Sequence, residues 1–145
     1  MTLNTLDRKR GPAPLAGITA LVVDDDPDIG QAVGHMLEAD GARVFVADSG
    51  REALDLIDRH RPDVILSDLT MPGMDGFEFL RRLRSDPQTA RLPVVAVTGN
   101  GRRSDCLRTW EAGFDGHVGK PVDWTTLIAA VHRCVLRPRP EPAAA

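Results

Sequence analysis

The chain has 145 residues, of which 42% are hydrophobic, so it can bury the core of one globular domain. Its formal net charge of −3 gives no general reason to expect binding to nucleic acid or to a membrane surface. We find no apolar stretch long enough for a transmembrane helix and no signal peptide, and we therefore expect a cytoplasmic protein.

Short apolar runs alternate along the chain with segments whose apolar residues have helical spacing. Such runs are typical of strands in a parallel sheet that helices cover on both faces. The predicted strands span 18–23, 42–46, 64–67, 94–97 and 116–118. Arg43 in the second run indicates that this strand is partly exposed at an edge of the sheet. The alternation predicts a doubly wound α/β fold with right-handed crossovers.

The predicted helices carry recognisable terminal signals. Asp26 followed by Pro27 is typical of an N-cap and a first helical residue, and Gly41 is a signal for the end of that helix. Ser49 and Asp123 are the expected N-caps of the second and the last helix. These signals favour a structural role for Asp26 over a role in binding a metal.

Both ends of the chain lack the pattern of the middle. Residues 1–16 contain basic residues, glycine and proline without strand or helix periodicity, and we expect a flexible leader. Residues 138–145 are rich in proline and alanine and are predicted to be disordered, because proline cannot continue the last helix. The predicted folded domain therefore spans 17–137.

Polar side chains follow or end the predicted strands. Asp24 and Asp25 follow the first strand, Asp68 the third, Thr98 the fourth, and Lys120 comes soon after the fifth. The carboxyl ends of parallel strands form the crevice in which open α/β sheets bind ligands. Several carboxylates in one crevice need a compensating cation, and Mg²⁺ takes oxygen ligands and bridges to phosphate. The sequence therefore predicts a site for a divalent cation and a phosphoryl group.

These residues lie in motifs that resemble the response-regulator receiver domain of two-component signalling. The motifs, in order, are VVDDDP at 22–27, DVILSDLTMPGMDG at 63–76, VTG at 97–99 and GKP at 119–121. The resemblance extends over about 18–136, and the segment 113–123 is most similar to receivers attached to hybrid sensor kinases. It implies a flavodoxin-like fold with a five-stranded parallel sheet in the order 2-1-3-4-5.

The resemblance also implies a phosphoacceptor and a Mg²⁺ site. Asp68 would accept the phosphoryl group from the phosphohistidine of a sensor histidine kinase or a histidine phosphotransfer protein. Asp25 and Asp68 would bind Mg²⁺ directly, together with the backbone carbonyl of Thr70, and Asp24 would act mainly through water.

A second group of residues is implied to hold the phosphate and report its presence. Thr98, with Gly99 in the same motif, and Lys120 would bind phosphoryl oxygens, and a cis bond between Lys120 and Pro121 would aim the ammonium inward. His117 departs from the family, which usually has tyrosine or phenylalanine here. Our hypothesis is that His117 still turns inward when Thr98 moves. The alternative is a surface histidine without a switch role.

Three classes of function fit the motifs to different degrees. The favoured class is a phosphorylatable signalling module, not an enzyme, which assists only its own phosphorylation and dephosphorylation and changes its partner-docking face. An aspartate phosphatase of the haloacid-dehalogenase type is the alternative, because Asp24 and Asp26 have its Asp-x-Asp spacing, but Pro27 and Asp28 depart from its next positions. A pseudo-receiver that only docks to partners is a third possibility. We expect a protein partner for the output and no nucleic-acid or membrane partner.

The two cysteines, Cys106 and Cys134, have neither Cys-x-x-Cys nor metal-ligand spacing. We expect both to be buried or half-buried free thiols in a reducing compartment.

Overall fold

The computed structural model describes residues 13–99 and 103–136, with the side chains of 103–105 left out. In this part of the chain a five-stranded parallel sheet has the order β2-β1-β3-β4-β5, which confirms the predicted order. The strands are β1 Thr19–Val23, β2 Arg43–Ala47, β3 Val64–Asp68, β4 Val94–Thr98 and β5 Gly116–Gly119. The edge position predicted for the strand that contains Arg43 is also confirmed.

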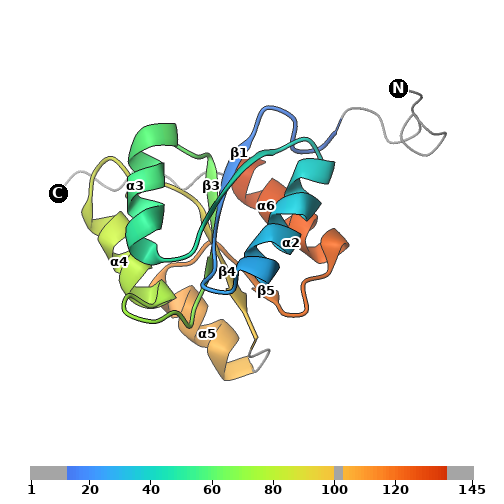
Figure 1. Cartoon of the computed structure of the whole chain (residues 1–145). Helices are drawn as coiled ribbons and strands as arrows, with labels where there is room; N and C mark the ends of the chain where they lie inside the picture. Colours follow the sequence, from blue (N-terminus) through green and yellow to red (C-terminus); the bar gives the residue numbers. More distant parts are fainter. Residues whose placement is uncertain (1–12, 100–102, 137–145) are drawn as a thin grey trace, which may run out of the picture.

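Helices cover both faces of the sheet. They are α2 Pro27–Ala39, α3 Gly50–His60, α4 Gly76–Ser85, α5 Arg103–Ala112 and α6 Trp124–Leu136. Helices α2 and α6 lie on one side of the sheet, and α3, α4 and α5 lie on the other (Figure 1). None of the helices in the described ranges has the length and hydropathy that a bilayer-spanning helix needs.

The core has two halves because successive residues of a strand point to opposite faces. In β1, Ala20 and Val22 pack with residues of α2 and α6, whereas Leu21 and Val23 pack with residues of α3 and α4. The central strand β3 is buried along its whole length. A strand buried on both faces has no polar face, which explains the continuous apolar runs in the sequence.

Short-range hydrogen bonds fix the helix starts. The carboxylate of Asp26 accepts from the backbone N–H groups of Asp28 and Ile29, with Pro27 in the first turn, so the predicted N-cap is confirmed. The predicted caps Ser49 and Asp123 likewise accept a backbone N–H three residues on. The carboxylate of Asp26 therefore serves as the N-cap of α2.

One boundary differs from the sequence-based prediction. Leu15, which lies in the predicted leader of 1–16, is fully buried, and its backbone N–H donates to the carbonyl of Asp40 at 2.8 Å. The packed part of the chain therefore includes residues before 17. Residues 1–12 and 137–145 lie outside the described part, and the flexible leader and disordered tail remain predictions there.

Candidate functional site

The strand register brings the predicted site residues to one edge of the sheet. Val23 pairs with Ser67, and Asp68 in turn pairs with Val97, so the ends of β1, β3 and β4 are level. Thr98 pairs with Gly119 at the end of β5. All of these strands end at the same edge. Asp68 and Thr98 are the last residues of β3 and β4, whereas Asp24, Asp25 and Lys120 directly follow β1 and β5.

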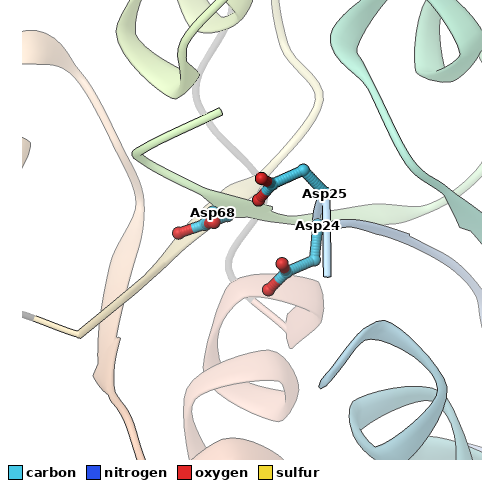
Figure 2. A group of neighbouring side chains, drawn as sticks. All are labelled: Asp24, Asp25 and Asp68. Carbon is cyan, nitrogen blue, oxygen red and sulfur yellow. The ribbon is translucent and has the colours of Figure 1, made fainter. Parts of the chain in front are cut away.

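Three carboxylates meet at this edge. One oxygen from each of Asp24, Asp25 and Asp68 lies within 4.8 Å of the others, and Figure 2 shows the three side chains together. Asp24 and Asp68 are 3% and 7% exposed, whereas Asp25 is open to solvent. The donor set consists of hard oxygens, two of them on buried side chains, with one exposed carboxylate at the entrance. This set fits Mg²⁺.

Lys120 provides the positive charge that faces the two buried carboxylates. Its Nζ lies 3.1 Å from Oδ2 of Asp24 and 3.4 Å from Oδ1 of Asp68. The peptide bond between Lys120 and Pro121 is cis, and the Lys120 N–H donates to the carbonyl of Thr98 at 2.8 Å. Burial works to lower the pKa of Lys120, but the hydrogen bond to Asp24 and the charges of both carboxylates outweigh it, and the pKa is raised.

The surroundings of Asp68 disfavour the charged form of its carboxyl group. Burial, followed by the charge of Asp24, raises its pKa, while Lys120 and a backbone hydrogen bond from Thr70 work in the opposite direction. The ammonium of Lys120 therefore does not fully compensate the negative charge of Asp68 beside Asp24. A further cation at the site would relieve the remaining repulsion.

The other predicted residues lie around this centre. Thr98 is buried at the end of β4, and Gly99 follows it with open space where a side chain would stand. Thr70 is exposed, and together with Thr98 and Arg108 it lines a pocket of about 320 Å³. The structure thus brings together the acids, Lys120, Thr70 and Thr98, whereas their roles in binding metal or phosphate remain predictions.

His117 lies on β5, half-buried, and pairs in register with Ala96. Its imidazole contacts the thiol of Cys106 on α5. The sequence analysis did not predict this contact, since Cys106 had been considered only for its spacing to other cysteines. A search for a histidine near each cysteine in the predicted fold would have been needed to find it. The switch role of His117 remains a prediction.

Replacing Asp68 by asparagine is expected to stabilise the metal-free protein near neutral pH, because it removes a buried charge. The pKa of Asp68 is raised above its ordinary value of 3.8, so the native state holds this proton more tightly than the unfolded chain. The stability that this carboxyl contributes is fully present below its unfolded pKa and is lost as pH rises through the folded pKa. Urea titrations in EDTA from about pH 4 to about pH 7 should show the wild type losing stability relative to Asp68→Asn. Parallel pH profiles would contradict this.

Comparison with known proteins gives a consistent result. A family model described as the response regulator receiver domain matches residues 20–132. The chain is 43% identical over 122 residues to the "uncharacterized 14.6 kDa protein in sodA1 3′ region" of Leptolyngbya boryana, a match that covers 84% of this chain and 93% of that protein.

Two further similarities carry more informative names. The response regulator Rre1 of Synechocystis sp. is 36% identical over 83% of this chain, and the match covers 52% of Rre1, so the chain spans about half the length of that relative. The solved structure of the chemotaxis response regulator CheY4 of Vibrio cholerae superposes with a TM-score of 0.74 at 35% identity. That match covers 80% of this chain and 97% of CheY4.

Proposed function

The chain belongs to the response-regulator receiver domain family of two-component signalling, and from that premise we propose that it accepts a phosphoryl group on Asp68. The observation that carries the proposal is the group of Asp24, Asp25 and Asp68 with Lys120 between the two buried members. Phosphoryl transfer needs positioning and charge neutralisation more than covalent machinery. This crevice supplies both.

The metal in this proposal is Mg²⁺, held by the carboxylates of Asp25 and Asp68 and the backbone carbonyl of Thr70. Asp24 already accepts an N–H from Asp26 at 2.9 Å and pairs with Lys120, which supports its indirect role through water. When bound, Mg²⁺ neutralises charge on the phosphoryl oxygens.

The proposed reaction forms an acyl phosphate. An oxygen of the Asp68 carboxylate attacks the phosphorus of a phosphohistidine, a P–O bond forms, and the P–N bond breaks with its electron pair going to the histidine nitrogen. Lys120 then exchanges its contact with the Asp68 carboxylate for a contact with a phosphoryl oxygen. The hydroxyl of Thr98 donates to another oxygen, with Gly99 leaving space beside it.

The output is a change at the protein surface near these residues. Movement of Thr98 toward the phosphate would change the surface beside the end of β4, and His117 on the neighbouring β5 would respond. The partners are a sensor histidine kinase or a histidine phosphotransfer protein for input and another protein for output. The setting is the cytoplasm, and the chemistry is limited to self-phosphorylation and self-dephosphorylation.

Incubation with acetyl phosphate and Mg²⁺, followed by intact-mass measurement, tests the proposal. We expect the wild type to gain one phosphoryl group and Asp68→Asn to gain none. Asp26→Asn is the matched control from the same acidic run: asparagine is as good an N-cap as aspartate, so this variant should gain the group like the wild type. An adduct on Asp68→Asn would contradict the assignment. A wild type that neither gains mass nor binds beryllofluoride would favour a pseudo-receiver.

A second measurement, with an unrelated phosphate ester in excess, separates this function from that of a phosphatase. A receiver consumes acetyl phosphate to form one adduct per chain, which then hydrolyses at its own rate. A haloacid-dehalogenase-type enzyme would instead turn over an excess of an unrelated phosphate ester. Rapid multiple turnover of such an ester would overturn the assignment as a signalling module.

A further inference from the structure

A thiol and an imidazole from two different elements lie against each other at one edge of the sheet. Cys106 belongs to the first turn of α5 and His117 to β5. The Cys106 sulfur lies 3.6 Å from Nδ1 and 3.8 Å from Nε2 of His117, and both side chains are half-buried. The sulfur is nearly equidistant from the two nitrogens, so its proton can pass to whichever of them carries no hydrogen.

This arrangement has the parts of an activated thiol. The thiolate is the nucleophilic form of cysteine, and an adjacent general base can generate it by taking the thiol proton. Cys106 has the histidine beside it and lies within the first turn of α5. Its partial exposure leaves a path for a small reactant.

We propose that Cys106 is a modification site that forms mixed disulfides with low-molecular-mass organic disulfides, with His117 as the proton acceptor. His117 takes the thiol proton, and the Cys106 sulfur attacks one sulfur of the reactant. A protein S–S bond forms, the S–S bond of the reactant breaks, and the second half leaves as a thiolate that can recover the proton from His117. No other oxidant is needed, because the disulfide itself is reduced.

The surroundings of Cys106 favour an organic group. Trp110 lies four residues after Cys106 on the same helix, and residues with this spacing are neighbours on a helix surface. Trp110 is 56% exposed and therefore leaves apolar surface uncovered one helical turn from Cys106. An aromatic or aliphatic adduct on Cys106 can pack against this ring and lose contact with water.

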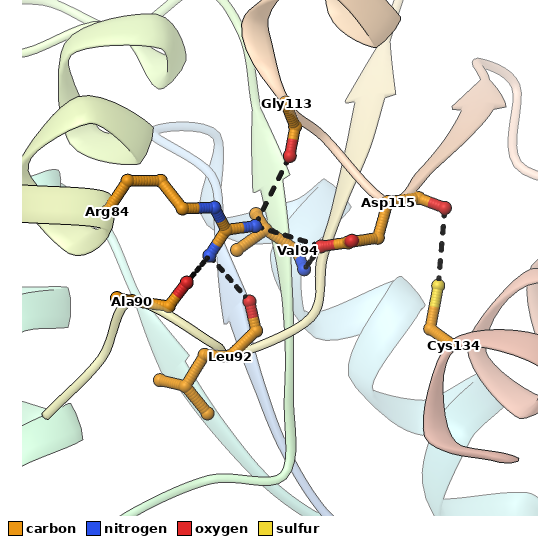
Figure 3. A network of polar contacts seen from close by, with 7 residues as sticks. All are labelled: Arg84, Ala90, Leu92, Val94, Gly113, Asp115 and Cys134. Atoms are coloured by element: carbon orange, nitrogen blue, oxygen red, sulfur yellow. Dashed lines mark hydrogen bonds and ion pairs between the residues drawn. The ribbon is translucent and has the colours of Figure 1, made fainter. Parts of the chain in front are cut away.

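The second cysteine has the opposite environment and serves as an internal control. Cys134 is 5% exposed, and its thiol donates to the carbonyl of Asp115 at 3.6 Å (Figure 3). Burial raises the pKa of the Cys134 thiol to about 11, so at neutral pH it stays protonated. The folded protein should therefore present one reactive thiol.

The test uses the unphosphorylated full chain and dithiodipyridine, an uncharged aromatic disulfide that releases a coloured thiopyridone. We expect the native protein to release one equivalent quickly, with peptide mapping placing the adduct on Cys106, and Cys106→Ser to lose this phase. His117→Phe should react at roughly one tenth of the wild-type rate or more slowly still, since it lacks the base. His132→Phe, which replaces an exposed histidine on α6, should react like the wild type.

Denaturant separates loss of the base from loss of the fold. All variants that keep Cys106 should react at one common rate when unfolded, and circular dichroism should show that His117→Phe is folded under native conditions. A native His117→Phe that reacts as fast as the wild type would overturn the proposal, as would a fast adduct on Cys134. Because neither Mg²⁺ nor a phosphodonor is present, failure here is independent of failure to phosphorylate Asp68.

Discussion

Replacing Arg84 by methionine is expected to lower the free energy of unfolding by about 3 kcal/mol, because it leaves a largely buried carboxylate without its cation. The guanidinium donates to Oδ2 of Asp115 at 2.9 Å and also to the backbone carbonyls of Ala90, Leu92 and Gly113 (Figure 3). Both charged side chains are less than one-fifth exposed, so solvent screens the pair weakly. Methionine keeps an apolar stem but supplies none of these donors.

Urea denaturation followed by far-UV circular dichroism measures this loss. Arg82→Met is the matched control on the same helix, because the Arg82 side chain is 56% exposed and its ion pair within the described residues is a 3.6 Å contact with Glu78. Exposed pairs with this spacing contribute about 0.5 kcal/mol or less, so the control should unfold like the wild type. Equal effects of the two substitutions would show that the contacts of Arg84 contribute no more than a surface pair.

Local signals in the sequence predicted the helices and strands, and the family resemblance was needed for the order of the strands. The Asp26-Pro27 cap and the apolar runs each depend on residues close together in the chain, and the order of the strands follows from the family resemblance. The strand ends were predicted one residue short at Asp68 and Thr98, because a polar residue at the end of a buried strand has the same sequence pattern as the start of a loop. Leu15 was missed because it packs from outside any periodic element.

The sequence also predicted which residues meet at the candidate site, but it did not predict the contacts made elsewhere in the fold. Parallel strands end at a common edge, so Asp24, Asp68 and Lys120 could be expected to meet once the strands were located. Contacts between other parts of the fold gave no such signal. Arg84 and Asp115 lie 31 positions apart, and neither Arg84 nor Cys106 belongs to a motif that would name its partner. Such pairs depend on how a helix is placed against the sheet, which the periodicity of one segment does not determine.

Replacing Gly76 by alanine is expected to lower the free energy of unfolding by about 3 kcal/mol, at the upper end of the usual cost of overpacking. Gly76 is the first residue of α4, and its N–H donates to the carbonyl of Leu69 at 2.9 Å. A Cβ at this position would meet the backbone carbonyl of Asp68 and lie 2.8 Å from the Cα of Leu69. Backbone at the end of the central strand cannot yield locally, so either α4 or the strand end that carries Asp68 must shift. Urea denaturation should report the loss, and acetyl phosphate labelling should slow.

Gly50→Ala is the matched control, because Gly50 is also a buried first helical residue that follows an N-cap. Its added Cβ would lie 2.6 Å from the sulfur of Met74, which is the far end of a flexible side chain and can move aside. Alanine is also a better helix former than glycine by about 1 kcal/mol, so we expect a change of about 1 kcal/mol or less in either direction. If both substitutions destabilised the protein equally, the cost at Gly76 would belong to the helix start in general. A larger loss at Gly76 alone, with slower labelling of Asp68, would assign the cost to the close approach of α4 to the strand end that positions the phosphoacceptor.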